Sequence, residues 1–169
     1  MRNVILTGFM GTGKSSVGKL LATELGFRFR DLDEMIESIE NLTINELFDK
    51  YGEGHFRSLE EAVVRSLSDA ERVVLSTGGG AVISRKNRAV FRSIGCIVNL
   101  TASPEMIVER LEHDDRRPLL KGSKTRETIE KLMRERESFY ADADIRIDTT
   151  GKKLEDVTRE IVLFLEGRD

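Results

Sequence analysis

The chain has 169 residues, which is long enough for one full hydrophobic core and too short for two comfortable ones. Charged residues make up 34% and apolar residues 39%, as in ordinary folded proteins, and a net charge of −3 provides no basic field to attract nucleic acid or an anionic membrane. One cysteine excludes an internal disulfide, and the sequence has neither a run of about 20 apolar residues nor the pattern of a signal peptide, so we expect a cytoplasmic protein. A chain of this size without a coiled-coil pattern is expected to work as a monomer.

Short apolar segments alternate with amphipathic stretches along the chain. Segments 4–6, 73–75 and 97–98 are rich in β-branched residues without polar alternation, which is typical of strands buried on both faces of a parallel sheet. Residues 27–32 and 145–147 are weaker strand candidates. Strands that alternate with helices predict an α/β fold, a three-layer sandwich around a central parallel sheet of five strands.

Capping residues mark the starts of several predicted helices. Thr43 and Glu46 have the spacing of a capping box. Ser103 followed by Pro104 provides an N-cap and a proline at the first helical position. Thr125 is placed to cap a long charged helix.

Two segments interrupt the simple alternation. Residues 33–68 are predicted to be wholly helical, as an insertion between the second and third strands. Residues 112–124 are charged and broken by a proline, which indicates a mobile surface loop. Binding and closing groups are often carried on such excursions. We therefore expect residues 1–169 to form a single domain with a substrate-binding insertion and a lid.

Residues 8–15, GFMGTGKS, match the phosphate-binding pattern G-x-x-x-x-G-K-[ST], the Walker A motif. An apolar strand precedes the motif and an amphipathic stretch, 14–25, follows it. Glycines let backbone N–H groups point at phosphate oxygens, and the following helix offers its positive end. Lys14 is expected to reach the β- and γ-phosphates of ATP, and Ser15 to ligate Mg²⁺. A glycine-rich turn without a ligand is the alternative, and the strand–loop–helix context disfavours it.

Asp31 and Asp33 end the second predicted strand. If the chain is still extended there, both carboxylates point to the same side, beyond the carboxyl end of the sheet where ligands bind. We expect Asp31 to serve the outer shell of the metal and Asp33 to accept a hydrogen bond from a substrate hydroxyl. The alternative is that Asp33 caps the next helix and Asp31 is solvated.

The motifs together resemble those of the shikimate kinases, a branch of the nucleoside-monophosphate-kinase-like P-loop fold. The resemblance covers nearly the whole chain, in the family's order and spacing. The matching pieces are residues 8–16, Asp31-Leu32-Asp33, 52–60 (GEGHFRSLE), 75–80 (LSTGGG), 117–120 (RPLL), and Arg136 with Tyr140.

This resemblance implies an ATP-dependent phosphotransferase that phosphorylates the 3-hydroxyl of shikimate in the chorismate pathway of aromatic amino-acid biosynthesis. The implied catalytic residues are Lys14, Asp33 and Arg117. The implied nucleotide-binding residues are Gly11, Thr12, Gly13, Lys14, Ser15, Ser16, Arg110, Arg117 and Lys153. The implied shikimate-binding residues are Asp33, Arg57, Gly78, Gly79, Gly80 and Arg136, and the implied metal-binding residues are Ser15 and Asp31.

The chemistry of these residue types agrees with those roles. Shikimate carries one carboxylate, which the guanidinium forks of Arg57 and Arg136 can bind bidentately. Arg117, on a loop, is placed to swing over the phosphates and neutralise charge in the transition state. The third strand ends in Ser76 where many P-loop enzymes have a metal-binding acid, which leaves more of the metal binding to Ser15 and Asp31.

Two other functions remain open from the sequence. The first is another small-molecule kinase on the same fold, such as a gluconate or nucleoside-monophosphate kinase, although the paired arginines and paired aspartates favour shikimate. The second is a nucleotide-binding switch without kinase activity. Consumption of ATP that depends on shikimate distinguishes the kinase from the switch.

Overall fold

The computed structural model describes residues 3–112 and 125–168. The predicted lid lies almost entirely outside these residues. The elements in chain order are β1 (Asn3–Thr7), α1 (Lys14–Leu25), β2 (Arg28–Asp31), α2 (Leu32–Glu40), α3 (Ile44–Ser66), β3 (Val73–Ser76), the 3₁₀ turn η1 (Ala81–Ile83), α4 (Arg85–Ile94), β4 (Cys96–Thr101), α5 (Pro104–Leu111), α6 (Arg126–Tyr140), β5 (Ile145–Asp148) and α7 (Leu154–Glu166).

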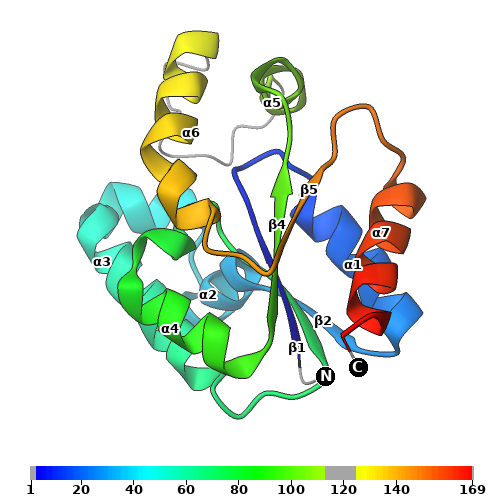
Figure 1. Cartoon of the computed structure of the whole chain (residues 1–169). Coiled ribbons are helices and arrows are strands. Elements are labelled where there is room, and N and C mark those ends of the chain that lie inside the picture. The colour runs from blue at the N-terminus through cyan, green and yellow to red at the C-terminus, as the bar shows by residue number, and fades with distance from the viewer. Residues whose placement is uncertain (1–2, 113–124, 169) are drawn as a thin grey trace.

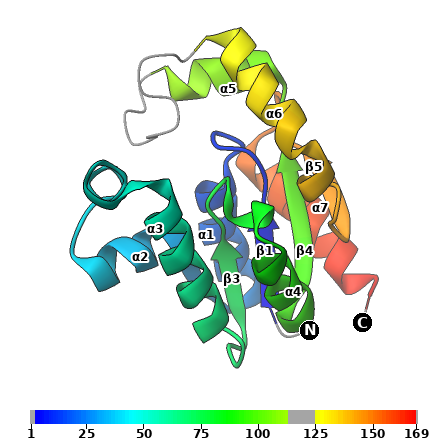
Figure 2. The same ribbon diagram turned by 90° about the vertical axis from the view of Figure 1, so that its left-hand side faces the viewer.

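The five strands form one parallel sheet in the order β2-β3-β1-β4-β5, which confirms the predicted fold class. Helices α1 and α7 cover one face, and α2, α3 and α4 cover the other (Figure 1). Helices α5 and α6 lie beyond the carboxyl ends of the strands, as the view in Figure 2 also shows. Within the described residues no helix is long and apolar enough to cross a membrane.

Alternating side chains on each strand supply two separate apolar layers. Leu6 of β1 and Val98 of β4 pack against α1 and α7, together with Leu21 and Ile161 of those helices. Ile5 of β1 faces the opposite side and packs in a cluster with residues of α2, α3 and α4. The strands are therefore apolar on both faces because helices cover both, as their lack of polar alternation predicts.

A third apolar cluster lies at the carboxyl edge of the sheet. Phe9 and Met10, from the loop after β1, pack there with Ile107 of α5, and with Ile129 and Tyr140 of α6. All five side chains are at least 95% buried. This cluster attaches the loop after β1 to the two helices that lie above the sheet.

The helical insertion is interrupted at two places. Helix α2 ends at Glu40, Asn41 follows in a left-handed conformation (φ 54°), and α3 begins after Thr43. Thr43 and Glu46 form the capping box that the sequence predicts for the start of this helix. Gly52 (φ 78°, ψ 171°) then kinks α3, and the sequence did not predict this second interruption. The other predicted N-caps are confirmed at the starts of α5 and α6.

Close packing between α1 and β2 gives a test of the core. A Cβ added at Gly18 would lie 2.5 Å from the Phe29 ring and 3.2 Å from Leu6 Cδ1. We expect Gly18→Ala to lower the free energy of unfolding by about 1–3 kcal/mol, because overpacking displaces both neighbours. Gly54→Ala is the matched control in α3, where a Cβ meets nothing within 4 Å, and it should raise stability by about 0.5–1 kcal/mol. Urea denaturation of the two variants measures both effects, and equal stabilities would contradict the packing.

Candidate active site

The loop between β1 and α1 has the backbone of a phosphate-binding loop. Gly8 has a φ of 140°, and a Cβ there would lie 2.2 Å from the carbonyl oxygen of Leu100 on the neighbouring strand. Gly13 has a φ of 92° at the N-cap position of α1, and no side chain caps that end. The first N–H groups of α1 therefore remain available to an anion, with the positive end of the helix dipole behind them.

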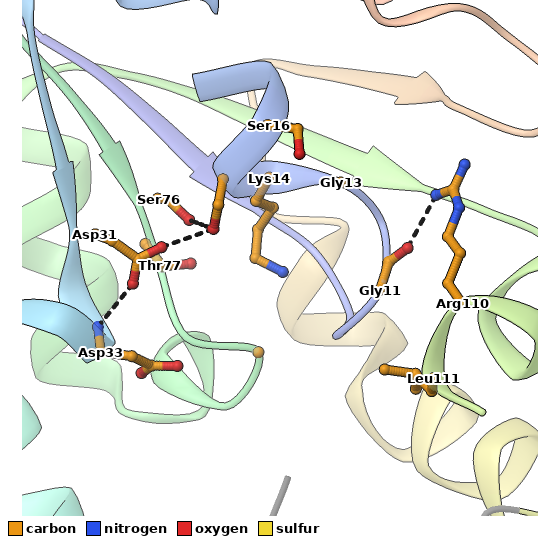
Figure 3. Close-up of a pocket in the computed structure, with 12 residues that line it drawn as sticks. Gly11, Gly13, Lys14, Ser16, Asp31, Asp33, Ser76, Thr77, Arg110 and Leu111 are labelled. Atoms are coloured by element: carbon orange, nitrogen blue, oxygen red, sulfur yellow. Dashed lines mark hydrogen bonds between the residues drawn. The ribbon is translucent and has the colours of Figure 1, made fainter. Parts of the chain in front are cut away.

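Lys14 begins α1 and is only 8% exposed. Its ammonium group donates to the carbonyl oxygens of Gly8 and Phe9, each at 2.8 Å, so the side chain follows the loop (Figure 3). It lines a cavity of about 260 Å³ at the carboxyl edge of the sheet. The lining residues are Gly11, Gly13, Lys14, Ser15, Ser16, Asp31, Asp33, Ser76, Thr77, Gly79, Arg110 and Leu111.

Three oxygen-bearing side chains meet at one wall of this cavity. The Ser15 hydroxyl donates to Asp31 Oδ2 at 2.7 Å and lies 3.3 Å from the Ser76 hydroxyl (Figure 3). The other carboxylate oxygen of Asp31 accepts from the backbone N–H groups of Asp33 and Glu34, which fixes its orientation. Hard oxygen ligands in this small number suit Mg²⁺, which binds a few protein oxygens and retains water or phosphate oxygens. No group of three or more metal-ligating His, Cys, Asp or Glu side chains occurs in the described part of the chain.

The chain is not extended through both aspartates. Strand β2 ends at Asp31, because its side chain caps α2, and Asp33 lies in the first turn of that helix. Both carboxylates nevertheless line the same cavity. Asp33 also approaches the turn after β3 closely, since a Cβ on Gly78 would lie 2.8 Å from Asp33 Oδ1. The alternative with Asp33 as the cap is wrong, and Asp31 has that position.

Charged side chains from two helices lie close to the three glycines after β3, residues 78–80. A Cβ on Gly80 would lie 2.3 Å from Arg57 Nη2, and one on Gly79 would lie 3.8 Å from Arg136 Nη1. Arg136 is 5% exposed and donates to the Gly79 carbonyl at 3.4 Å. The hydroxyl of Tyr140, one turn later in α6, donates to the same carbonyl oxygen. The structure thus brings together Arg57 and Arg136, which are far apart in the sequence.

Glu60 belongs to this group and was not assigned a role from the sequence. It is 1% exposed, and Arg57 Nη1 donates to its two oxygens at 3.1 and 2.9 Å. Burial raises the pKa of the Glu60 carboxyl to about 7, because desolvation outweighs the charge and hydrogen bonds of Arg57, and nearby Asp33 raises it further. The i,i+3 spacing of Arg57 and Glu60 on a helical segment is the signal that could have indicated this pair.

The remaining predicted nucleotide-binding residues differ in position. Arg110 donates from Nη1 to the Gly11 carbonyl at 2.9 Å and to Thr149 Oγ1 at 3.4 Å, so it ties α5 to the loop. Thr12 is buried, and its hydroxyl bonds to the Phe9 carbonyl. Lys153 is exposed at the N-cap of α7 and is not among the residues that line this cavity. Arg117 lies outside the described residues.

The raised pKa of Glu60 predicts a pH dependence of stability. Between its ordinary value of 4.5 and about 7, the folded protein holds a proton that the unfolded chain has released. Stability therefore falls as pH rises through this window, and the loss persists above it. As the pH rises from 4.5 to above 7, the unfolding free energy of the wild type should fall by about 3 kcal/mol more than that of Glu60→Gln, which has no carboxyl to titrate at this position. Urea denaturation at pH 4.5, 6 and 8 measures the difference, and parallel profiles would contradict the assignment.

The site and the fold both have counterparts among known proteins. A family model described as shikimate kinase matches residues 10–166. A shikimate kinase of Geobacter metallireducens is 60% identical over 168 residues, which is 99% of this chain and 94% of that protein. The solved structure of the shikimate kinase from Acinetobacter baumannii in complex with shikimate covers 100% of this chain and 95% of its own, with a TM-score of 0.96 and 33% identity.

A gluconokinase from Sinorhizobium meliloti 1021 is much less similar. Its solved structure covers 96% of this chain and 90% of its own, but the TM-score is 0.58 and the identity 18%. That likeness concerns the fold alone, whereas the relatives above match in sequence along nearly the whole chain. The chain belongs to the shikimate kinase family.

Proposed function

We propose that this protein transfers the γ-phosphoryl group of Mg·ATP to the 3-hydroxyl of shikimate, giving shikimate 3-phosphate and ADP. The observation that carries the proposal is one cavity that Lys14 and Ser15 enter from the phosphate loop and Asp33 enters from α2. Donor phosphates and an acceptor hydroxyl can therefore meet there directly. Membership of the family supplies the identities of donor and acceptor.

The donor half of the reaction rests on the loop and on the start of α1. The N–H groups of residues 11–16 and the ammonium of Lys14 hold the β- and γ-phosphates, and Arg110 keeps α5 against the loop through the Gly11 carbonyl. Mg²⁺, when bound, neutralises charge on the phosphate oxygens. Ser15 and Asp31 would hold it, with the Asp31 carboxylate oriented by two backbone N–H groups.

The acceptor half rests on the glycine turn and the groups around it. Arg57 and Arg136 bind the carboxylate of shikimate with charged, forked donors. The Glu60 carboxylate orients the Arg57 guanidinium through an ion pair, with Oε2 2.9 Å from Arg57 Nη1. Asp33 accepts the hydrogen bond of the 3-hydroxyl, orients it toward the γ-phosphorus and takes its proton as the new bond forms.

Residues 1–169 act in this proposal as a single domain and as a cytoplasmic monomer. Residues 33–68 are the substrate-binding insertion. The expected lid, residues 112–124 with Arg117, lies almost entirely outside the described residues. Few large apolar side chains are exposed in the described residues, which suits a monomer. They are Ile39, Tyr51, Ile83, Leu154 and Leu163.

Acceptor dependence tests the proposed function. In a coupled assay of ADP release with Mg·ATP, we expect turnover with shikimate and none above background with gluconate, AMP or no acceptor. Asp33→Asn should lower kcat by about 10²–10⁴-fold and leave the KM for ATP unchanged, because the amide keeps the shape but cannot take the proton. Release with another acceptor would discard shikimate, and release without any acceptor would discard the kinase.

The magnesium assignment predicts a separate effect at Asp31. Asp31→Asn should preserve the fold, because asparagine caps helices as well as aspartate does. We expect the Mg²⁺ concentration for half-maximal activity to rise by about tenfold, since a carboxylate no longer faces the Ser15 hydroxyl. Glu34→Gln, three residues after Asp31 in the first turn of α2, is the control and should leave the Mg²⁺ dependence unchanged. An equal response of the two variants would count against the site.

A further inference from the structure

A row of polar side chains crosses three strands near the carboxyl edge of the sheet. Thr7 of β1 is in register with Asn99 of β4, and Asn99 is in register with Arg146 of β5. In-register residues of parallel strands point to the same face, and alternation along the strands gives this row the face of Ile5 and Ile97. The row is therefore two residues closer to the carboxyl ends of the strands than Ile5 and Ile97 of the apolar cluster on that face.

Hydrogen bonds join the members of this row and orient the amide of Asn99. Arg146 has only donors, so its Nε donates to Asn99 Oδ1, at 3.1 Å. Asn99 Nδ2 then points the other way and donates to Thr7 Oγ1 at 3.3 Å. Asn99 is 0% exposed, and both ends of its buried amide are satisfied. A buried amide with both ends in use holds the guanidinium of Arg146 in one plane.

The other end of Arg146 reaches helix α6. Its Nη1 donates to Glu137 Oε1 at 2.6 Å, and its Nη2 donates to Glu137 Oε2 at 3.1 Å. The two side chains are partly exposed, and an ion pair of that kind contributes little by itself. Here, however, the Arg146 guanidinium binds both oxygens of Glu137, and its Nε is held by the buried Asn99 amide. Glu137 is thus tied to the sheet by a chain of oriented contacts.

Glu137 directly follows Arg136, the helix residue that contacts the glycine turn. Successive residues of an α-helix are about 100° apart around its axis. Arg136 and Tyr140 hold α6 to the Gly79 carbonyl on one side, and Glu137 holds it to β5 on another. Helix α6 extends beyond the sheet, where β-strands do not support its outer part (Figures 1 and 2). The apolar packing of Ile129 and Tyr140 already holds α6 against α5 and the loop after β1. The two polar contacts, at different angles, add to this packing in fixing the rotation of the helix about its own axis.

We propose that Asn99, Arg146 and Glu137 are positioning residues for acceptor binding. They set the rotation of α6 and thereby aim the Arg136 guanidinium at the carboxylate of shikimate. The inference rests on the acceptor role proposed above for Arg136. It assigns a specific task to three residues that are outside the lining of the cavity between the phosphate loop and the glycine turn.

Steady-state kinetics of Arg146→Gln, Glu137→Gln and the double variant test this link. We expect each single variant to raise the KM for shikimate by about fivefold, with kcat and the KM for ATP within about twofold of wild type. The double variant should show no further rise, because both changes break the same contact. Asn99→Leu, which keeps the branched shape of the side chain and removes the amide, should give the same pattern. Arg146→Lys should rescue little, because an ammonium cannot form the fork.

Glu130→Gln is the matched control. Glu130 accepts from Arg126 at 2.7 Å within α6 itself, so its loss removes an ion pair without releasing the helix from the sheet. Its KM for shikimate should be that of wild type. An equal rise in Glu130→Gln would overturn the inference. A rise in both Michaelis constants together with a fall in Tm would overturn it too, since general destabilisation would then explain the loss.

Arg136→Ala separates this inference from the proposed function. If it raises the KM for shikimate strongly while Arg146→Gln and Asn99→Leu leave it unchanged, Arg136 binds the acceptor and the positioning role is wrong. If Arg136→Ala itself leaves that KM unchanged, the acceptor role of Arg136 fails, and the inference built on it fails as well.

Discussion

All five strands of the sheet run in one direction, and the site depends on that constraint. Parallel pairing brings every carboxyl end to the same edge, and the order β2-β3-β1 places Asp31 and Leu6 on either side of Ser76, with the phosphate loop just beyond Leu6. The Ser15 hydroxyl meets Asp31 at 2.7 Å for this reason, although most of α1 and β2 lies between them in the chain. Reversal of any of these strands would send its functional residue to the opposite edge.

Donor and acceptor groups are also joined through the apolar cluster at that edge. Phe9 of the phosphate loop packs with Tyr140, and the guanidinium of Arg136 lies over the Phe9 ring, 5.8 Å from its centroid. The Glu60 carboxyl is buried near this edge's charged groups, and its desolvation raises its pKa although Arg57 is paired with it. The apolar cluster therefore holds the phosphate loop against α6, and the Arg57–Glu60 ion pair holds the charged side chains at the glycine turn.

The sequence predicted the fold and most of the phosphate-binding half because those features are local. β-branched runs mark strands that are buried on both faces, and the glycine–lysine–serine spacing of the loop determines its own geometry. The backbone at Asp33 is helical and not extended, because the side chain of Asp31 caps α2 and ends the strand there, although both carboxylates line one cavity. Glu60 went unassigned because a carboxylate on a charged helix is usually solvated, and its burial comes from distant elements. The link from Asn99 to Arg146 depends on strand register, which no local pattern specifies.

In the proposed reaction donor and acceptor meet in one cavity, so that the phosphoryl group passes directly to the 3-hydroxyl. Phosphorus-31 NMR of the reaction with Mg·ATP and shikimate distinguishes this transfer from hydrolysis of ATP. We expect one new phosphomonoester resonance, coupled to the proton on C3 and formed in step with ADP, with little inorganic phosphate. Inorganic phosphate in place of the ester, or an ester at another hydroxyl, would contradict it.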